Sequence, residues 1–447
     1  MTLRTSVIAR LVVMGMILIG LLIPLSMVQS VVSERTARRD SVINDVSSTW
    51  GGSQTVAGPV LVVPYQCTVT DRDGPRIVTG RATFLPDSLS VQGSLGPQIR
   101  GRSFFDTVVY SAHLVVTGRF SPPDLSPVTR GDVQPLWKES VVNLGVSDPR
   151  GIAKRVSLDW EGADHPFEPG IVDTGLMASG LHARVDLTAG SALKTAIPFS
   201  LTLDLNGSRD LRVLPAGNDT SVRLASSWPH PGFIGAPLPQ SRTVDASGFT
   251  AQWDVPYFGR GFSRAWTDAG LDREKMKTQA EAAAFGVSLV QPVDIYQQAE
   301  RAVKYAVMFI VLTFVVFFLF EVVRARLLHP VQYVFVGFAL CVFYLLLVSL
   351  SEHTGFDIAY AAAAVGTTAL ISSYSMFVLG GVLEGALVGI AIAAVYAFLY
   401  LLLRLEDYAL LAGSLGLFAT LSVVMLLTRK VNWYDLRLGT GDRDLAG

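Results

Sequence analysis

The chain has 447 residues, of which 50% are hydrophobic and only 16% are charged, and its formal net charge is −1. A soluble domain usually carries about a quarter charged residues, and a chain this close to neutral has no overall field to attract nucleic acid or acidic lipid. The composition therefore excludes a soluble protein along the full chain and argues against a nucleic-acid partner.

Six apolar segments are long enough to cross a bilayer as helices, which takes about 20 residues. They lie at 7–28, 302–323, 331–350, 358–373, 376–402 and 407–427. We expect an N-terminal transmembrane anchor at 7–28 and a five-helix transmembrane bundle over 302–427. The first segment could instead be a cleaved signal peptide, but its long apolar run and the lack of a nearby AxA-type site favour a retained anchor.

The Lys and Arg residues of short loops predict the orientation of the bundle. The 324–330 loop carries Arg324 and Arg326, whereas the 351–357 loop carries neither Lys nor Arg. Four more basic residues follow the last span: Arg429, Lys430, Arg437 and Arg443. We therefore expect the 324–330 loop and a C-terminal tail at 428–447 to be cytoplasmic. Because the chain has six spans, both ends lie on the same side, and we expect a cytoplasmic N-terminus at 1–6.

This orientation exports residues 29–301, and we expect them to form a periplasmic domain. Cys67 would then lie in water and Cys341 in lipid, so the two cysteines should not pair. The sequence has no CxxC, haem or zinc spacing. The chain suits an oxidising compartment without depending on a disulfide.

Residues 40–290 read as strands punctuated by Gly, Pro and Asp. In 197–215 the residues Leu201, Leu203 and Leu205 alternate with polar residues, and Asn206-Gly207 follows, which predicts a hairpin turn. Similar β-rich runs occupy 60–70, 106–120 and 153–160. The pattern favours a large all-β domain, such as an antiparallel sandwich with a sizeable core.

Two helical features interrupt or follow this β-rich region. The segment 270–285 reads as a helix, and Pro292 suits the start of a helix that runs unbroken into the second span. Glu300 and Lys304 would form an i,i+4 pair at the wet end of that helix.

Several motifs resemble the CreD family of bacterial inner-membrane proteins, also called cell envelope integrity proteins. They are "FGVSLVQPVDIYQQAERAVKYAVMFIVLTFVVFFLFEV", "LHPVQYVFVGFALCVFYLLLVSLSEHTGF", "LGVSDPRGI" and "LNGSRDLRVLPAGNDTSVRLASSWPHPGFIG". The resemblance covers nearly the whole chain and is most specific over 286–357; Gly232 stands where the family pattern leads us to expect Ser. It implies an inner-membrane protein with a large periplasmic domain and a role in envelope integrity, colicin tolerance and β-lactam-related envelope stress. It supplies no catalytic residues.

The exported region offers few candidates for catalysis or metal binding. Asp164, His165 and Glu168 in "ADHPFEPG" could ligate a metal, although a solvated loop is the preferred interpretation. Trp228, His230 and Phe233 in "WPHPGF" could form an aromatic rim, but a rigid connection that packs Trp228 on the core is preferred. The sequence lacks HExxH, GxSxG, SxxK and Walker A motifs in a convincing context, so we expect no enzyme, no cofactor and no metal.

The membrane segments carry more informative polar residues. Glu384 is expected about 12 Å deep in the fifth span, at 1.5 Å per residue, where an acid is by default a functional candidate. Gly381, Gly385 and Gly389 around it form a ridge that would let the fourth span approach closely, through Ala361–Ala364 and Gly366. Glu384 could equally be protonated, or hydrogen-bonded as a packing element.

The remaining candidates lie at the ends of the spans. Glu321, His329 and Gln332, with Tyr333, cluster at the turn between the second and third spans, where an ordinary interfacial turn is preferred to a partner site. At the opposite end, Glu352, His353 and Asp357 could form a pH switch. Helix capping is the preferred interpretation, with Asp357 as the N-cap of the fourth span.

Three functions remain open, in this order of preference. The first is a non-enzymatic envelope protein whose β domain binds a periplasmic or envelope partner. The second is a transporter, or a transporter accessory, that uses Glu384. The third is an envelope hydrolase using acids and histidines of the outer domain.

Overall fold

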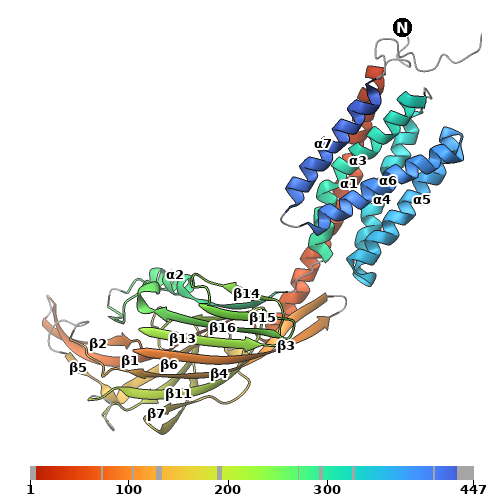
Figure 1. Cartoon of the computed structure of the whole chain (residues 1–447). Helices are drawn as coiled ribbons and strands as arrows, with labels where there is room; N and C mark the ends of the chain where they lie inside the picture. The colour runs from red at the N-terminus through yellow and green to blue at the C-terminus, as the bar shows by residue number, and fades with distance from the viewer. Residues whose placement is uncertain are drawn as a thin grey trace, which may run out of the picture. The chain divides into compact units, whose positions relative to one another are not determined.

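A computed structural model of the chain describes residues 7–71, 74–102, 105–126, 133–188, 194–269, 271–290, 295–324, 328–405 and 408–429. The chain divides into two compact units (Figure 1). The helical unit comprises Met1–Asp40 with Val293–Gly447, and the β unit comprises Ser41–Pro292. Pro292, Arg326, Lys430, Arg437 and Arg443, on which parts of the sequence predictions rest, lie outside the described residues.

The helical unit contains the six predicted spans, and each is a helix long and apolar enough to cross a bilayer. The helices are α1 (Val7–Trp50), α3 (Ile295–Arg324), α4 (Pro330–Thr354), α5 (Phe356–Leu379), α6 (Val382–Arg404) and α7 (Ala409–Thr428). The turn between α4 and α5 is shorter than hydropathy indicated, because Gly355, at φ 79°, alone separates the two helices. The polar stretch 351–357 is therefore mostly helical.

One face of α1 belongs to the core of the helical unit. Leu21, Leu25, Val28 and Val32 recur at spacings of three and four residues and are buried with residues of α3 and α4. Leu21 packs over Gly337 of α4, where a side chain in place of the glycine hydrogen would collide with it. The first span is thus packed as a member of the helical unit along much of its length.

The helix α1 is longer than the apolar segment that predicted it. It continues through polar residues to Trp50, so the expectation of strands from residue 40 is wrong for residues 40–50. Residues 29–50 contain neither Gly nor Pro, and the helix ends where Gly51 takes a φ of 118° that only glycine adopts easily. Hydropathy detects the part of a helix that crosses lipid, and it does not detect a polar extension.

The β unit is built from two sheets that share one hydrophobic core. In the ten-stranded sheet the main order is β14-β18-β12-β1-β6-β10-β9, with β2 and β5 on β1 and β17 on β2. In the eight-stranded sheet the order is β15-β16-β13-β3-β4-β11-β7-β8. Most pairs are antiparallel, but β1 pairs with β12, and β3 with β13, in parallel.

The long strands that run through these sheets are β1 (Gln54–Asp71), β2 (Gly74–Phe84), β3 (Ser88–Arg102), β4 (Phe105–Phe120), β11 (Ile197–Ser208) and β16 (Gly248–Pro256). The shorter strands are β5 (Val133–Pro135), β6 (Ser140–Val146), β7 (Ser157–Trp160), β8 (Ala163–Pro166), β9 (Glu168–Pro169), β10 (Gly180–Val185), β12 (Asp210–Leu214), β13 (Asp219–Ser226), β14 (Pro231–Ile234), β15 (Ser241–Asp245), β17 (Ala265–Thr267) and β18 (Phe285–Leu289). Leu201, Leu203 and Leu205 are buried in β11, as their alternation predicted.

The hairpin predicted at Asn206-Gly207 does not form. Strand β11 continues through both residues in register with β4, and the chain then crosses to the other sheet as β12. Gly207 is needed for close packing, because a side chain there would collide with the ring of Tyr110. The residue that takes a positive φ is Arg209, at 64°.

The helix expected at 270–285 is present as α2 (Arg273–Ala283), and the Asp272 side chain caps it by accepting from the Lys275 backbone N–H. The next segment, 285–289, is strand β18, paired on both sides with β14 and β12. Helix α3 runs unbroken from Ile295 through the second span, and Glu300 and Lys304 pair at 3.0 Å.

Candidate functional site

A buried acid joins three helices at one end of the helical unit. Glu321 of α3 is only 2% exposed, and its carboxylate forms an ion pair with Arg10 of α1. It also accepts hydrogen bonds from the Tyr333 hydroxyl of α4, at 2.9 Å, and from the Leu328 backbone N–H, at 3.4 Å. The predicted grouping of Glu321 with Tyr333 is confirmed, whereas the role of Arg10 as their cation was missed.

His329 and Gln332 act together as the N-terminal cap of α4. The Val331 backbone N–H donates to His329 Nδ1 at 3.3 Å, and the His329 backbone N–H donates to Gln332 Oε1 at 3.0 Å. Pro330 occupies the first helical turn, as predicted. This reciprocal arrangement satisfies backbone donors that the helix itself cannot satisfy.

The opposite end of the helical unit carries Glu352. The Tyr296 hydroxyl of α3 donates to Glu352 Oε1 at 3.0 Å, and Arg35 of α1 lies 3.7 Å from the same oxygen. His353, the next residue, is exposed. Glu352 therefore connects its own helix, α4, to α1 and α3.

Asp357 does not cap α5. The N-cap is Gly355, and the Asp357 carboxylate instead pairs with Arg404 and accepts from the Tyr400 hydroxyl at 3.1 Å. A one-residue turn leaves the N-cap position to Gly355, so the first acid of the helix reaches across to α6. The N-cap prediction is therefore wrong.

Glu384 does not lie deep in a span. A break at Gly380, at φ 72°, ends α5, and Glu384 falls in the first turn of α6 with its carboxylate over Gly381. Of the predicted glycine ridge, Gly385 and Gly389 are buried against α5, as expected. Their contacts are Met376 and Ser372, however, and not the alanines further along that helix.

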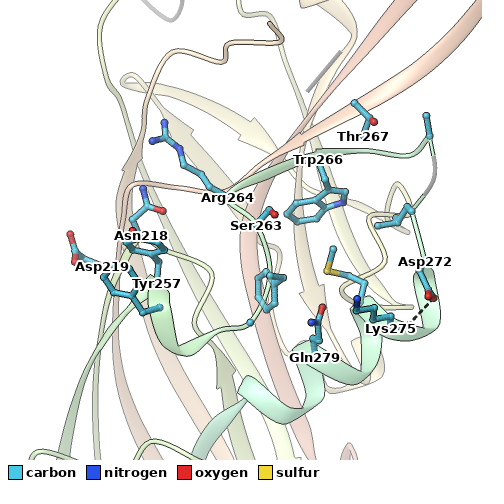
Figure 2. Close-up of a pocket in the computed structure, with 16 residues that line it drawn as sticks. Asn218, Asp219, Tyr257, Ser263, Arg264, Trp266, Thr267, Asp272, Lys275 and Gln279 are labelled. Carbon is cyan, nitrogen blue, oxygen red and sulfur yellow. Dashed lines mark hydrogen bonds between the residues drawn. The ribbon is translucent and has the colours of Figure 1, made fainter. Parts of the chain in front are cut away.

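The β unit holds a cleft of about 1170 Å³ that the sequence did not indicate (Figure 2). One wall is the loop that follows β16, and the other is the N-terminal half of α2, with Trp266 of β17 between them. Its polar lining residues, apart from Tyr257, are Asn218, Asp219, Ser263, Arg264, Thr267, Asp272, Lys275 and Gln279. Its volume exceeds the roughly 300–1,000 Å³ of most small-molecule pockets, so it suits an extended ligand.

Two aromatic side chains stand at the edge of this cleft. Tyr257 and Phe258 are 46% and 79% exposed, and their rings are in contact, with centroids 4.0 Å apart and planes tilted by 32°. A single exposed apolar residue needs no explanation, whereas two adjacent exposed rings that line a cleft form an apolar patch.

A buried arginine fixes the loop that carries this pair. Arg260 is 1% exposed and donates to the backbone carbonyls of Ala216, Gly217 and Phe262 and to the Asn218 side chain. Burial, together with the charge of Arg264, lowers the pKa of Arg260 to about 10, so the guanidinium is still charged at neutral pH. Burying a charge is costly, and its effect here is to hold residues 257–264 in one conformation.

The other motifs of the β unit lie on or beside short strands. Asp164 and His165 lie on β8 of one sheet and Glu168 on β9 of the other, so the solvated loop expected there is instead two short edge strands. The described part of the chain has no group of three His, Cys, Asp or Glu side chains that could hold a metal. The Trp228 indole packs on the core, as predicted, and donates to the Val290 carbonyl at 3.0 Å.

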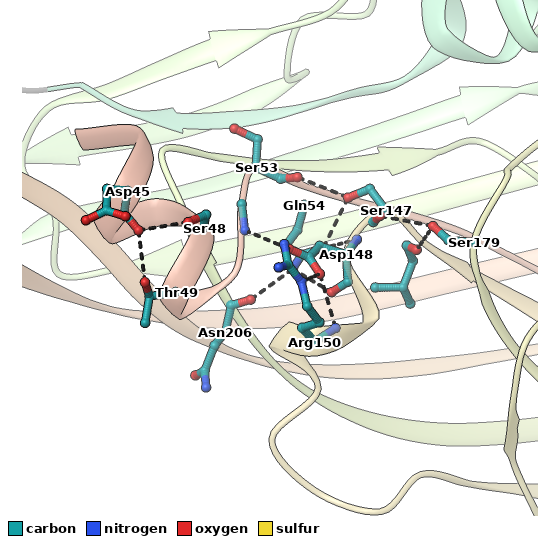
Figure 3. Close-up of polar contacts among 12 residues, drawn as sticks. Asp45, Ser48, Thr49, Ser53, Gln54, Ser147, Asp148, Arg150, Ser179 and Asn206 are labelled. Carbon is teal, nitrogen blue, oxygen red and sulfur yellow. Dashed lines mark hydrogen bonds and ion pairs between the residues drawn. The ribbon is translucent and has the colours of Figure 1, made fainter. Parts of the chain in front are cut away.

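The motif "LGVSDPRGI" anchors the start of β1 (Figure 3). The Gln54 side chain is fully buried; it donates to the carbonyls of Asp148 and Asn206 and accepts from the Ser147 hydroxyl and the Asp148 backbone N–H. Asp148 forms two hydrogen bonds with the Arg150 guanidinium, at 2.9 and 2.8 Å. The hydrogen bond from Arg150 lowers the pKa of Asp148 below its usual value. This network holds together chain segments that are far apart in the sequence.

Of the residues around the cleft, sequence reasoning singled out none. The signal that could have found them is "VPYFGRGFSRAW", in which an aromatic doublet sits between a proline and two glycines. Turn-forming residues around adjacent aromatics indicate exposed rings in a loop, whereas the rings of a strand alternate between its two faces.

Comparisons with known proteins agree with the membrane architecture. Residues 6–434 match the family described as Inner membrane protein CreD. The chain is 33% identical over 425 residues to the Inner membrane protein CreD of Escherichia coli (strain K12), covering 94% of this chain and 92% of that protein.

Among solved structures, an M1 zinc metallopeptidase from Deinococcus radiodurans and its variant bound to a Tyr-Ser-Ala substrate share 10% and 11% identity with this chain. Each match covers 38% of this chain, and the two cover 38% and 39% of the peptidase chains, with TM-scores of 0.17 and 0.18. Similarity this low carries no argument about fold or function. The near-complete family match and the six apolar helices show that the chain belongs to the CreD family, as a multi-pass protein of the inner membrane.

Proposed function

We propose that this protein supports cell envelope integrity without catalysing a reaction, by binding an envelope partner through its β unit. The observation that carries the proposal is the 257–264 loop, in which buried Arg260 holds two aromatic side chains in water beside a cleft. The tolerance to colicin and to β-lactam stress that the family resemblance implies is the physiological setting of this role.

The rigidity of the loop supports binding as its role. A loop that is ordered before its partner arrives loses little conformational entropy on association, and adjacent aromatic rings supply contact area with few rotatable bonds. Folding alone does not require Phe258 at the surface, since its side chain is 79% exposed. The loop is therefore better explained by contact with a partner than by the stability of the β unit.

We further propose that both chain termini are cytoplasmic and that the β unit is periplasmic. The orientation rests on basic residues next to the ends of the spans, which favour the cytoplasmic side. They are Arg324, Arg326, Arg429 and Lys430. A green fluorescent protein fused after Gly447 should fluoresce, and protease added to spheroplasts should cleave only the β unit. A dark fusion with a protected β unit would invert the orientation.

Site-specific photo-crosslinking in cells tests the binding role. A photoreactive amino acid at position 258 should give a discrete adduct with an envelope component, because the native side chain projects at the cleft. The matched control is position 238, where Leu238 is 65% exposed outside the cleft lining and should give no such adduct. Identical adduct patterns at the two positions, or none at 258, would count against the proposal.

The structure supports the two alternative functions less directly than it supports binding. The transporter hypothesis depended on an acid deep in a span, and Glu384 lies in the first turn of α6. For the hydrolase alternative, His165 lies on the eight-stranded sheet and His230 immediately before β14 of the ten-stranded sheet. The acid–histidine pairs that the β unit does form are His113 with Asp204, at 2.7 Å, and His182 with Glu168, at 3.7 Å.

A further inference from the structure

We infer that the cleft of the β unit binds a neutral oligosaccharide, with a sugar ring stacked on Phe258 and Tyr257. The inference rests on the proposed function and names the chemical class of ligand for the same site. Three properties of the cleft lead to it: its balanced charge, its polar groups on both walls and its aromatic pair.

The charge of the lining favours a neutral ligand. Its acids are Asp219 and Asp272 and its bases are Arg264 and Lys275, two of each sign, so the lining has a formal net charge of zero. A site for phosphate groups or for an anionic lipid headgroup would carry an excess of cations, because paired Arg and Lys charges supply most of that affinity. This cleft has no such excess.

The polar groups suit a ligand with hydroxyl groups around its rim. Asp219 and Ser263 are exposed on one wall, and Lys275 is exposed on the other, with Gln279 one helical turn further along α2 (Figure 2). Hydroxyls both donate and accept, so they can satisfy carboxylate, amide and ammonium groups at once. An apolar ligand would leave these groups desolvated without partners, which opposes its binding.

The aromatic pair supplies the apolar contact that a sugar ring needs. A pyranose ring presents C–H groups on its faces and hydroxyls around its edge, so it can stack on an aromatic ring while its hydroxyls reach polar side chains. Phe258 is held in place by the adjacent Tyr257 ring and by the loop that Arg260 fixes. The combination of a fixed apolar platform with a polar rim is the usual composition of a small-ligand site.

The test is isothermal titration calorimetry on the full-length protein in lipid nanodiscs. The probes are chitotetraose, a β-1,4-linked N-acetylglucosamine tetramer, maltotetraose, and an uncharged tetrapeptide with blocked ends. We expect saturable binding of at least one saccharide and none of the tetrapeptide. Phe258→Ala should weaken saccharide binding by about tenfold or more, which corresponds to about 1.4 kcal/mol, because it removes the aromatic anchor of the site.

Two further variants separate stacking from folding. Phe258→Trp keeps an aromatic face and should bind within about threefold of the wild type, and Leu238→Ala removes an exposed apolar side chain outside the cleft and should change nothing. Saccharide binding that survives Phe258→Ala unchanged would overturn the stacking site.

The outcomes also separate this inference from the proposed function. Adducts from position 258 together with binding of the tetrapeptide and not of the saccharides would assign the cleft to a peptide, so the inference would fall while the proposed function stood. The same adducts with no saccharide binding at all would likewise remove only the inference. If position 258 gives no adduct and no probe binds, both the inference and the proposed function would fall.

Discussion

The two units hold a buried charge in opposite ways. In the helical unit, the Glu321 carboxylate meets the Arg10 cation of another helix, with Tyr333 and a backbone N–H as further donors. In the β unit, the Arg260 guanidinium is surrounded by backbone carbonyls and one amide side chain. The first arrangement fastens separate helices together, whereas the second shapes a single loop.

The difference follows from what each unit has to offer a charge. Helix backbones use their own donors and acceptors, so a charge inside a helical unit must find a side chain of opposite sign. The loops of a β unit present carbonyls that no strand satisfies, and a five-donor guanidinium can satisfy several of them at once. The surroundings of a buried charge therefore decide whether it joins separate helices or fixes the conformation of one loop.

The largest effect is expected from breaking the ion pair of the helical unit on one side. Glu321→Ala leaves Arg10 facing a poorly hydrated site, and we expect a loss of about 3–5 kcal/mol in the free energy of unfolding. Denaturant titration of the full-length protein in detergent micelles measures it. The double variant Arg10→Met with Glu321→Leu should recover most of the loss, because an apolar pair of similar size needs no compensation.

The matched control is the exposed pair at the start of α3. Glu300 and Lys304 lie 3.0 Å apart at the surface, so Glu300→Ala should cost about 0.5 kcal/mol or less. Equal costs for Glu321→Ala and Glu300→Ala would contradict the view that the Arg10–Glu321 pair links helices.

An intermediate effect is expected from substituting Arg260, the buried arginine of the β unit. Arg260→Met leaves the carbonyls of Ala216, Gly217 and Phe262 without their donor. We expect a loss of about 2–3 kcal/mol in the stability of the β unit. The thermal unfolding of the full-length protein reports that loss. Crosslinking from position 258 should fall as well, because the loop loses its fixed conformation.

Two further substitutions sharpen this result. Arg260→Lys keeps the charge without the planar fork of donors, so it should recover only part of the stability. Arg223→Met, at an exposed arginine of β13 in the same unit, is the control and should cost little. Full recovery with lysine would show that the charge alone matters and would weaken the contrast between the two units.

The smallest effect is expected at Asp148, a partly exposed acid of the β unit. Its folded pKa lies below the usual 3.8, chiefly because Arg150 donates to it. A depressed carboxylate pKa stabilises the fold above the unfolded pKa, and this contribution is lost as the pH falls through the folded value. Asp148→Asn should therefore cost about 1 kcal/mol at neutral pH, and its difference from wild type should shrink below about pH 4. A difference that persists in acid would assign the effect to packing.

Much of the architecture could be predicted from the sequence, because the signals are strong and local. Twenty apolar residues in a row have few alternatives to a membrane helix, and all six spans formed. The alternation of Leu201, Leu203 and Leu205 placed a strand with its inner face in the core. The N-terminal cap of α4 by His329 and Gln332 also needs only neighbouring residues.

The errors came from features that a local pattern leaves ambiguous. The Asn206-Gly207 pair suits a turn, but a glycine is equally required where a ring packs against the backbone, as Tyr110 does. Glu384 was placed deep because hydropathy does not register the helix break at Gly380 and Gly381. Tyr257 and Phe258 were missed because the loop that carries them is held by a buried arginine, most of whose partners lie more than 40 residues away.

The apolar helices, the β-rich region between the first two of them and the family could all be read from the chain itself, because each depends on composition or on patterns along a continuous stretch. Which charges meet and which side chains reach solvent became visible only in the folded molecule. Arg10 and Glu321 are 311 positions apart and became partners because α1 packs against α3 and α4. Such pairings depend on distances in space, which a one-dimensional pattern does not contain.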